Sequence, residues 1–129
     1  MTTWTSDELN RIGTAEELEV ASLRRDGTLR KAVTIWVVLQ GDDLYVRSVK
    51  GRTAGWFRDT QVRHEGHIQA GDIDKDVTFV DANPDINDQL DAVYRTKYRR
   101  YAASIVSHII SPEARSATIM LAPQKQSVS

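Results

Sequence analysis

Hydrophobic residues recur along this chain in short runs with a period of two, and glycine-containing turns separate the runs. Because successive side chains of a β-strand point to opposite faces, this period indicates strands. Hairpin turns are expected at Asp26-Gly27 and Gly41-Asp42, since glycine tolerates the positive φ that such turns need. Strands are predicted over residues 18–25, 31–40, 43–49, 61–70, 77–81 and 117–121.

The strand predicted over residues 31–40 is apolar on both faces. A strand of this kind is buried on both sides, as in the wall of a barrel or at the seam of a dimer. One face carries Val33, Ile35, Val37 and Leu39, and the other carries Ala32, Thr34, Trp36 and Val38.

Helical patterns stand near the two ends of the chain. Thr5 and Glu8 form a capping box, which predicts a helix to about Arg11 and a second helical turn over residues 14–17. Asn83-Pro84 opens a longer helix, whose apolar residues recur at helical spacing until it breaks near residue 104 or 107. A short helical turn is expected at residues 111–113.

The order of these elements predicts a mostly β (α+β) fold. Strands joined by hairpins rather than helical crossovers form an antiparallel sheet, and a small barrel with helices packed outside is the simplest arrangement. The pattern predicts one domain over residues 1–123 and a polar, disordered tail over residues 124–129.

Composition narrows the function classes. The chain has 129 residues, a net charge of -1 and no cysteine. The charge argues against nucleic acid binding, and the missing cysteine excludes disulfides, thiolate nucleophiles and sulfur metal sites. The sequence has no run of the ~18 apolar residues that a membrane span needs. It begins without a signal peptide pattern, so we expect a cytoplasmic protein.

A cationic stretch spans the end of the strand predicted over residues 43–49 and the start of the loop expected at residues 50–58. Arg47, Lys50 and Arg52 bring three positive charges together, and Ser48 and Thr53 add hydroxyls. Such groups are the parts of an anion-binding cradle. An ordinary surface loop is the alternative interpretation, since charged runs are usually solvated.

Trp56 follows this stretch directly and is able to border a planar ring. Gly51 and Gly55 allow backbone amides to approach a ligand closely. The stretch therefore predicts a site for a small anionic aromatic ligand, such as a phosphate joined to a flat heterocycle.

Other motifs carry less chemistry. His64-Glu65-Gly66-His67 lacks the spacing of a helical zinc motif, so no metal site is predicted. Asp72–Asp76 lacks the glycine and glutamate of a calcium loop and is interpreted as a solvated turn. No Gly-x-Ser-x-Gly elbow is present, so catalytic residues are not assigned.

Motifs along almost the whole chain resemble a small bacterial family of unknown function. They are Val33-x-x-Trp36-Val37-Val38, Asp43–Ser48, His64-Glu65-Gly66-x-Ile68, Asp76-Val77-x-Phe79, Asp91-x-x-Tyr94-x-x-Lys97-Tyr98 and Ala117-Thr118-x-x-Leu121-x-Pro123. That family is similar in turn to the flavin-binding split β-barrel proteins, which include pyridoxamine-phosphate-oxidase-like enzymes and deazaflavin-dependent nitroreductases.

The resemblance implies an antiparallel split β-barrel with flanking helices that forms a homodimer, with FMN or a deazaflavin at the seam. It implies an oxidoreductase in which the cofactor does the redox work. The positions that match phosphate-holding residues are Arg47, Ser48, Lys50, Arg52 and Thr53, together with Thr34 and Trp36 on the neighbouring strand.

Two other functions stay open at this point. The same barrel is able to serve as a non-catalytic module that holds a small ligand or cofactor. A cone-shaped α+β hydrolase or cyclase would need an Asp-His pair in an apolar pocket, and the sequence has no recognisable pairing of this kind.

Overall fold

Seven strands form one antiparallel sheet in the computed structural model, which describes residues 3–124. The strands are β1 (Leu18–Ser22), β2 (Val33–Ile35), β3 (Val38–Gln40), β4 (Asp43–Arg47), β5 (Glu65–Ala70), β6 (Ile73–Asp81) and β7 (Thr118–Pro123). Their order across the sheet is β2-β1-β5-β6-β7-β4-β3, and every neighbouring pair is antiparallel.

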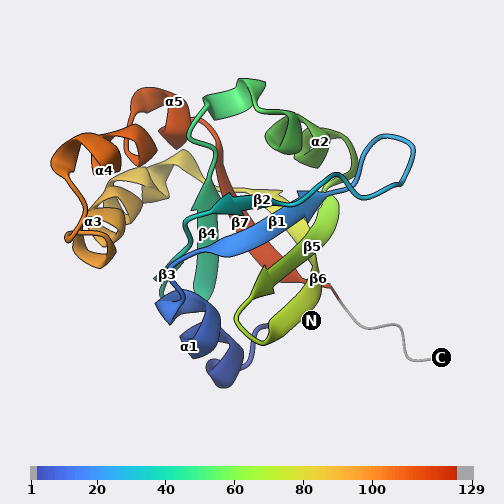
Figure 1. Cartoon of the computed structure of the whole chain (residues 1–129), viewed down its shortest axis with the longest axis horizontal. Coiled ribbons are helices and arrows are strands. Elements are labelled where there is room, and N and C mark those ends of the chain that lie inside the picture. Colours follow the sequence, from blue (N-terminus) through green and yellow to red (C-terminus); the bar gives the residue numbers. More distant parts are fainter. Residues whose placement is uncertain (1–2, 125–129) are drawn as a thin grey trace.

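Helices lie around this sheet. They are α1 (Ser6–Thr14), α2 (Gly55–Arg63), α3 (Asn87–Lys97), α4 (Ala103–Ile109) and α5 (Pro112–Arg115), with the 3₁₀ turns η1 (Gly51–Thr53) and η2 (Pro84–Ile86). Figure 1 shows α3, α4 and α5 gathered on one side of the sheet, with α1 and α2 near opposite ends of it.

The two edge strands come from one short segment, and this closes the sheet. Only Trp36 and Val37 separate β2 from β3, although the two strands are the outermost in the sheet. Three virtual bonds of extended chain span about 11 Å at most, so the edges must curl toward one another. The antiparallel split β-barrel expected from the resemblance is confirmed.

The strand predicted over residues 31–40 is therefore wrong as a single strand, since it bends at Trp36-Val37. At the bend the backbone of Val37 loses its ladder partners and bonds to side chains at the end of α3. Its N–H donates to the hydroxyl oxygen of Tyr98 at 3.2 Å, and its carbonyl accepts from Lys97 Nζ at 2.5 Å.

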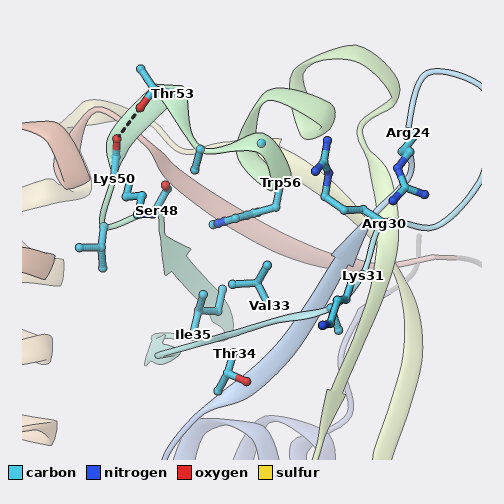
Figure 2. A pocket seen from close by; sticks show the side chains of 14 residues that line it. Arg24, Arg30, Lys31, Val33, Thr34, Ile35, Ser48, Lys50, Thr53 and Trp56 are labelled. Atoms are coloured by element: carbon cyan, nitrogen blue, oxygen red, sulfur yellow. Dashed lines mark hydrogen bonds between the residues drawn. The ribbon is translucent and has the colours of Figure 1, made fainter.

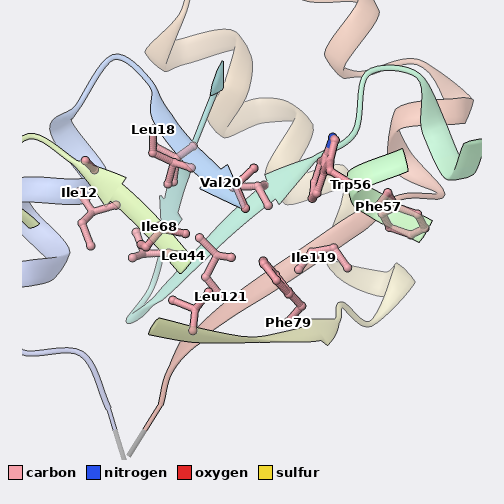
Figure 3. Packing of buried hydrophobic residues seen from close by; sticks show 14 of the residues in the cluster. Ile12, Leu18, Val20, Leu44, Trp56, Phe57, Ile68, Phe79, Ile119 and Leu121 are labelled. Carbon is pink, nitrogen blue, oxygen red and sulfur yellow. The ribbon is translucent and has the colours of Figure 1, made fainter. Parts of the chain in front are cut away.

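Two hydrophobic cores explain why residues 31–40 are apolar on both faces. Inside the curled sheet, Val37 packs with residues such as Leu44, Ile68 and Leu121 (Figure 3). Outside it, Trp36 and Val38 belong to a second core under α3 and α4. The outer face of this segment is thus covered by helices of the same chain from Trp36 onward, whereas Thr34 is exposed.

Several helices differ from the sequence prediction. The loop expected at residues 50–58 contains η1 and the first half of α2, and the strand expected from Gln61 begins only at Glu65. Helix α2 forms because it buries Trp56, Phe57 and Thr60 on one side, and it ends where His64 adopts a left-handed φ of 59°.

The C-terminal helix is also interrupted earlier than predicted. Helix α3 ends at Lys97 rather than near residue 104 or 107, and α4 begins a separate helix at Ala103. Tyr98 leaves the helical conformation with a φ of -108°, and its ring stacks on Trp36 at 3.8 Å between centroids. Its hydroxyl donates to the carbonyl of Glu16 at 2.7 Å.

Other local predictions had mixed outcomes. The capping box at Thr5 and the helical turn expected at residues 111–113 are confirmed, the latter as α5 with Ser111 at its N-cap. The helical turn expected at residues 14–17 is wrong beyond Thr14, since Ala15 is extended. The solvated turn expected at residues 72–76 is wrong too, because β6 begins at Ile73 and residues 74–76 pair with β5.

The ends of the chain leave some predictions untested. Gln124 donates from its backbone to Asp76 at 3.1 Å, whereas the rest of the expected tail, residues 125–129, lies outside the described residues. No helix within residues 3–124 combines the length and apolar character needed to cross a bilayer. The single domain over residues 1–123 and the cytoplasmic location stay predictions.

His67 joins β5 to β6 through two carboxylates and gives the sheet a pH-dependent contribution. Its Nδ1 lies 2.8 Å from Asp76, and its Nε2 also contacts Asp74. Burial alone would lower the pKa of His67, but hydrogen bonds and charge from Asp76 and Asp74 outweigh it and raise that pKa. The pairing therefore stabilises the fold at low pH and fades as pH rises through the raised pKa.

We expect His67→Gln to lower the free energy of unfolding more at about pH 5.5 than at about pH 8, the two sides of the ordinary histidine pKa. Urea denaturation at both pH values measures this. His64→Asn is the control, because asparagine tolerates the left-handed backbone at that position. An equal loss for His67→Gln at both pH values would contradict the assignment.

Candidate functional site

A pocket of about 620 Å³ opens between β2, the end of β4 and the first turn of α2, and we call it the basic pocket (Figure 2). Its volume lies within the range of about 300–1,000 Å³ that small-molecule sites occupy. Five of the residues predicted from the sequence line it: Thr34, Ser48, Lys50, Thr53 and Trp56.

Positive charge dominates the wall of the basic pocket. Arg24, Arg30, Lys31 and Lys50 line it, and none of its described lining residues is acidic. Arg30 pairs with Asp59 at 2.7 Å. Within residues 3–124, no carboxylate forms an ion pair with Lys31 or Lys50. These two ammonium groups are therefore available to an anionic ligand.

The first turn of α2 adds backbone donors. Ala54 precedes this turn without a side-chain cap, and the intrahelical ladder starts with Arg58 N–H donating to Ala54 at 3.0 Å. The N–H groups of the preceding turn have no intrahelical acceptor, and such groups attract anions. A Cβ at residue 55 would lie 3.0 Å from Arg30 Nη1, so glycine there lets this guanidinium lie close against the turn.

Ser48 contributes a buried hydroxyl to the wall of the basic pocket. The residue is 1% exposed, and its Oγ is buried without a hydrogen-bond partner among the described residues. A buried hydroxyl without a partner costs roughly 1–3 kcal/mol. Figure 2 shows Ser48 beside Lys50 and facing the indole nitrogen of Trp56. A ligand oxygen between these groups would satisfy the hydroxyl.

Trp56 and Thr53 are held in place by their own element. Trp56 is buried, and its ring meets Phe57 edge-on at 6.2 Å between centroids. Thr53 donates its hydroxyl to the carbonyl of Lys50 at 3.0 Å, which folds η1 back over the end of β4. The indole thus forms a rigid border of the pocket, next to the cations.

Arg47 does not fit the predicted role as a phosphate ligand. Its guanidinium is fully buried, and its five N–H groups match five protein contacts. It donates to Thr118, Asp91 and Ile109, and twice to Asn87, at 2.6–3.2 Å. No donor of Arg47 is left for a ligand, so we correct its assignment to a structural one.

Two further predicted residues lie outside the basic pocket. Arg52 donates to the carbonyl of Ser116 at 3.0 Å and stacks over the ring of Phe57, so it points to the opposite side of η1. Trp36 lies in the second core and stacks on Tyr98. Neither residue lines the wall that Ser48 and Lys50 share.

The sequence interpretation missed three cations of the site. Arg24, Arg30 and Lys31 flank the Asp26-Gly27 hairpin and reach the pocket because β2 folds back on β1. The signal was present as a basic pair on each side of the turn. The hairpin register decides which of these side chains face the pocket, and this register cannot be read from the charge pattern alone.

The family model for an uncharacterized protein conserved in bacteria, DUF2255, matches residues 8–121. The chain belongs to this family. Among curated proteins, none matches the DUF2255 chain. The small bacterial family of unknown function expected from the sequence motifs is thereby confirmed.

Solved structures similar to the DUF2255 chain share its fold at low sequence identity. An F420 reductase is 13% identical with a TM-score of 0.59, and the matched region covers 90% of this chain and 92% of the reductase chain. The haem storage protein HutZ from Vibrio cholerae is 13% identical, with a TM-score of 0.61 and coverage of 98% and 93%. A FAD-binding protein from Mesorhizobium loti is 15% identical, with a TM-score of 0.56 and coverage of 95% and 92%.

The described part of the chain holds no cluster of potential metal ligands. No group of three or more His, Asp or Glu within residues 3–124 is arranged to hold a metal ion. Of the histidines, His64 ends α2 and His67 pairs with aspartates on β6.

The buried ion pair of Arg47 gives a stability prediction. Arg47→Ala leaves Asp91 as a buried carboxylate without its main partner, so we expect a loss of about 3–5 kcal/mol in the free energy of unfolding. Chemical denaturation measures it. The control is Arg11→Ala, which breaks exposed pairs with Asp7 and Asp72 and should lower the free energy of unfolding far less. Equal losses for the two variants would reject the structural role.

Proposed function

We propose that this protein is an oxidoreductase of the split-barrel type that uses FMN or a deazaflavin. The observation that carries the proposal is the buried, unpartnered Ser48 Oγ, which lies with Lys50 and the first turn of α2 on one wall of the basic pocket. When bound, such a cofactor would supply the two-electron chemistry, so no protein acid or base is obligatory.

The residues present fit the phosphate end of such a cofactor. Lys50 offers a charge-assisted hydrogen bond, Ser48 offers a hydroxyl, and α2 offers backbone N–H groups. Arg30, held by Asp59, adds a positive charge over the same turn. These four kinds of donor would neutralise and orient a phosphate monoester.

The middle of the basic pocket fits a flat ring. Val33 and Ile35 on β2 and the indole of Trp56 form apolar walls in Figure 2. Rings bind such walls because apolar area leaves water. Supporting analogy comes from the split-barrel neighbours, among them an F420 reductase and a FAD-binding protein.

A homodimer is part of the proposal. Leu29 and Val49 are large apolar side chains that stay about half exposed near the basic pocket, and a second copy would cover them.

A non-catalytic binding module is the second candidate function. The cations, hydroxyl and amides of the basic pocket would bind a phosphorylated ring equally well without any reaction. Turnover with a reductant separates the two candidates, because only the oxidoreductase oxidises it.

Lys50→Ala tests the phosphate assignment. We expect FMN to bind more weakly by ~1.5–3 kcal/mol, or about 10- to 100-fold, because a charge-assisted hydrogen bond is lost. Riboflavin lacks the phosphate, so its affinity should not change in this variant. Calorimetric titration of both ligands measures the effect, with Arg99→Ala as the control for an exposed cation outside the pocket. An FMN affinity unaltered by Lys50→Ala would reject the assignment.

Ser48→Ala separates ligand binding from stability. Removing an unpartnered buried hydroxyl should not lower the free energy of unfolding, whereas FMN should bind about fivefold more weakly. Ser22→Ala is a matched control, because the Oγ of Ser22 is also buried without a partner but does not line the basic pocket. A Ser48→Ala variant that loses stability and keeps its FMN affinity would contradict the role of this hydroxyl.

A further inference from the structure

A second hollow of about 310 Å³ adjoins the basic pocket, and we call it the apolar pocket. The two pockets share Thr34, Ile35 and Val49 on their walls. The wall beyond these residues is formed mainly by Trp36, from the bend between β2 and β3, and by Ile105 and Ile109 on α4.

The floor of the apolar pocket is rigid and flat. Trp36 stacks on Tyr98 with 3.8 Å between centroids and 4° between ring planes. The hydroxyl of Tyr98 bonds to Glu16 and Val37, which fixes the stacked ring from behind. A preformed aromatic wall of this kind suits a planar ring, since little side-chain freedom is lost on binding.

The charges of the apolar pocket differ from those of the basic pocket. Arg47 is its only Lys or Arg among the described lining residues, and the guanidinium is buried with every N–H already bonded. Glu17 adds a carboxylate, which repels anions. His108, Thr34 and the indole N–H of Trp36 are the side-chain groups on this wall that are able to donate a hydrogen bond to a ligand oxygen.

We propose that the apolar pocket binds a second, uncharged ligand of one or two rings that carries a hydrogen-bond-accepting oxygen such as a carbonyl. The volume is at the lower end of the range of about 300–1,000 Å³ for small-molecule sites, which limits the ligand to this size. Its position beside the basic pocket would make it the site of the second reactant. That role rests on the proposed function, whereas the binding itself does not.

The test uses the full chain and the two-ring quinone menadione, which is uncharged and has two carbonyl oxygens. The absence of cysteine excludes addition of the quinone to a thiol. Ile105→Asp places a carboxylate on the wall, and Val62→Asp is a matched control on α2. The two native side chains are both 47% exposed, and Val62 does not line either pocket.

Calorimetry should show that menadione binds wild type and Val62→Asp alike. Ile105→Asp should bind it about tenfold more weakly or worse, because the ligand must desolvate a charge. Lawsone, a related quinone that is an anion at neutral pH, should bind wild type more weakly than menadione. The inference is overturned if wild type does not bind menadione, if the two Asp variants bind it alike, or if lawsone binds as tightly.

A further variant distinguishes this inference from the proposed function. Lys50→Ala should weaken FMN binding and leave menadione affinity unchanged, because Lys50 lines only the basic pocket. If FMN fails to bind while menadione binding depends on Ile105, the proposed cofactor is rejected and the apolar pocket stands. If FMN binds and menadione does not, the ligand proposed for the apolar pocket is rejected and the proposed cofactor stands.

Discussion

The buried guanidinium of Arg47 holds the helical layer of this protein against its barrel. It extends from the end of β4 and bonds to α3 through Asn87 and Asp91, to the end of α4 through Ile109, and to β7 through Thr118. A charge in the interior is costly unless it is paired and fully hydrogen-bonded, and here every donor has an acceptor. The position of α3 relative to the sheet depends on these contacts.

The position of α3 relative to the sheet determines how the barrel closes. The end of α3 brings Lys97 and Tyr98 to the bend at Val37, where they replace the ladder hydrogen bonds that the bend removes. Burial at this helix end lowers the pKa of Lys97 to about 8. Since the segment around this bend lines both pockets, the same contacts shape the candidate site.

The two pockets combine opposite chemistries along one wall of the barrel. Lysines, an unpartnered hydroxyl and a helix start lie on one side of Thr34 and Ile35, and stacked aromatic and aliphatic groups lie on the other. The split barrel itself does not specify a ligand, since a fold hosts many functions. Its neighbours include an F420 reductase and a haem storage protein. Function in this chain must therefore be argued from its own side chains.

Local patterns in the chain were enough to predict most strands, the hairpin turns, the first helix cap and the cationic stretch around Lys50. Residue alternation also assigned residues 33–39 correctly to two faces, but it did not reveal what covers each face. Long-range packing alone turned Arg47 inward and Arg52 away, and β1–β2 pairing brought Arg30 and Lys31 to the basic pocket. The physical reason is that a cation has the same local sequence signature whether its partner is a ligand or a carboxylate such as Asp91, which lies 44 residues away.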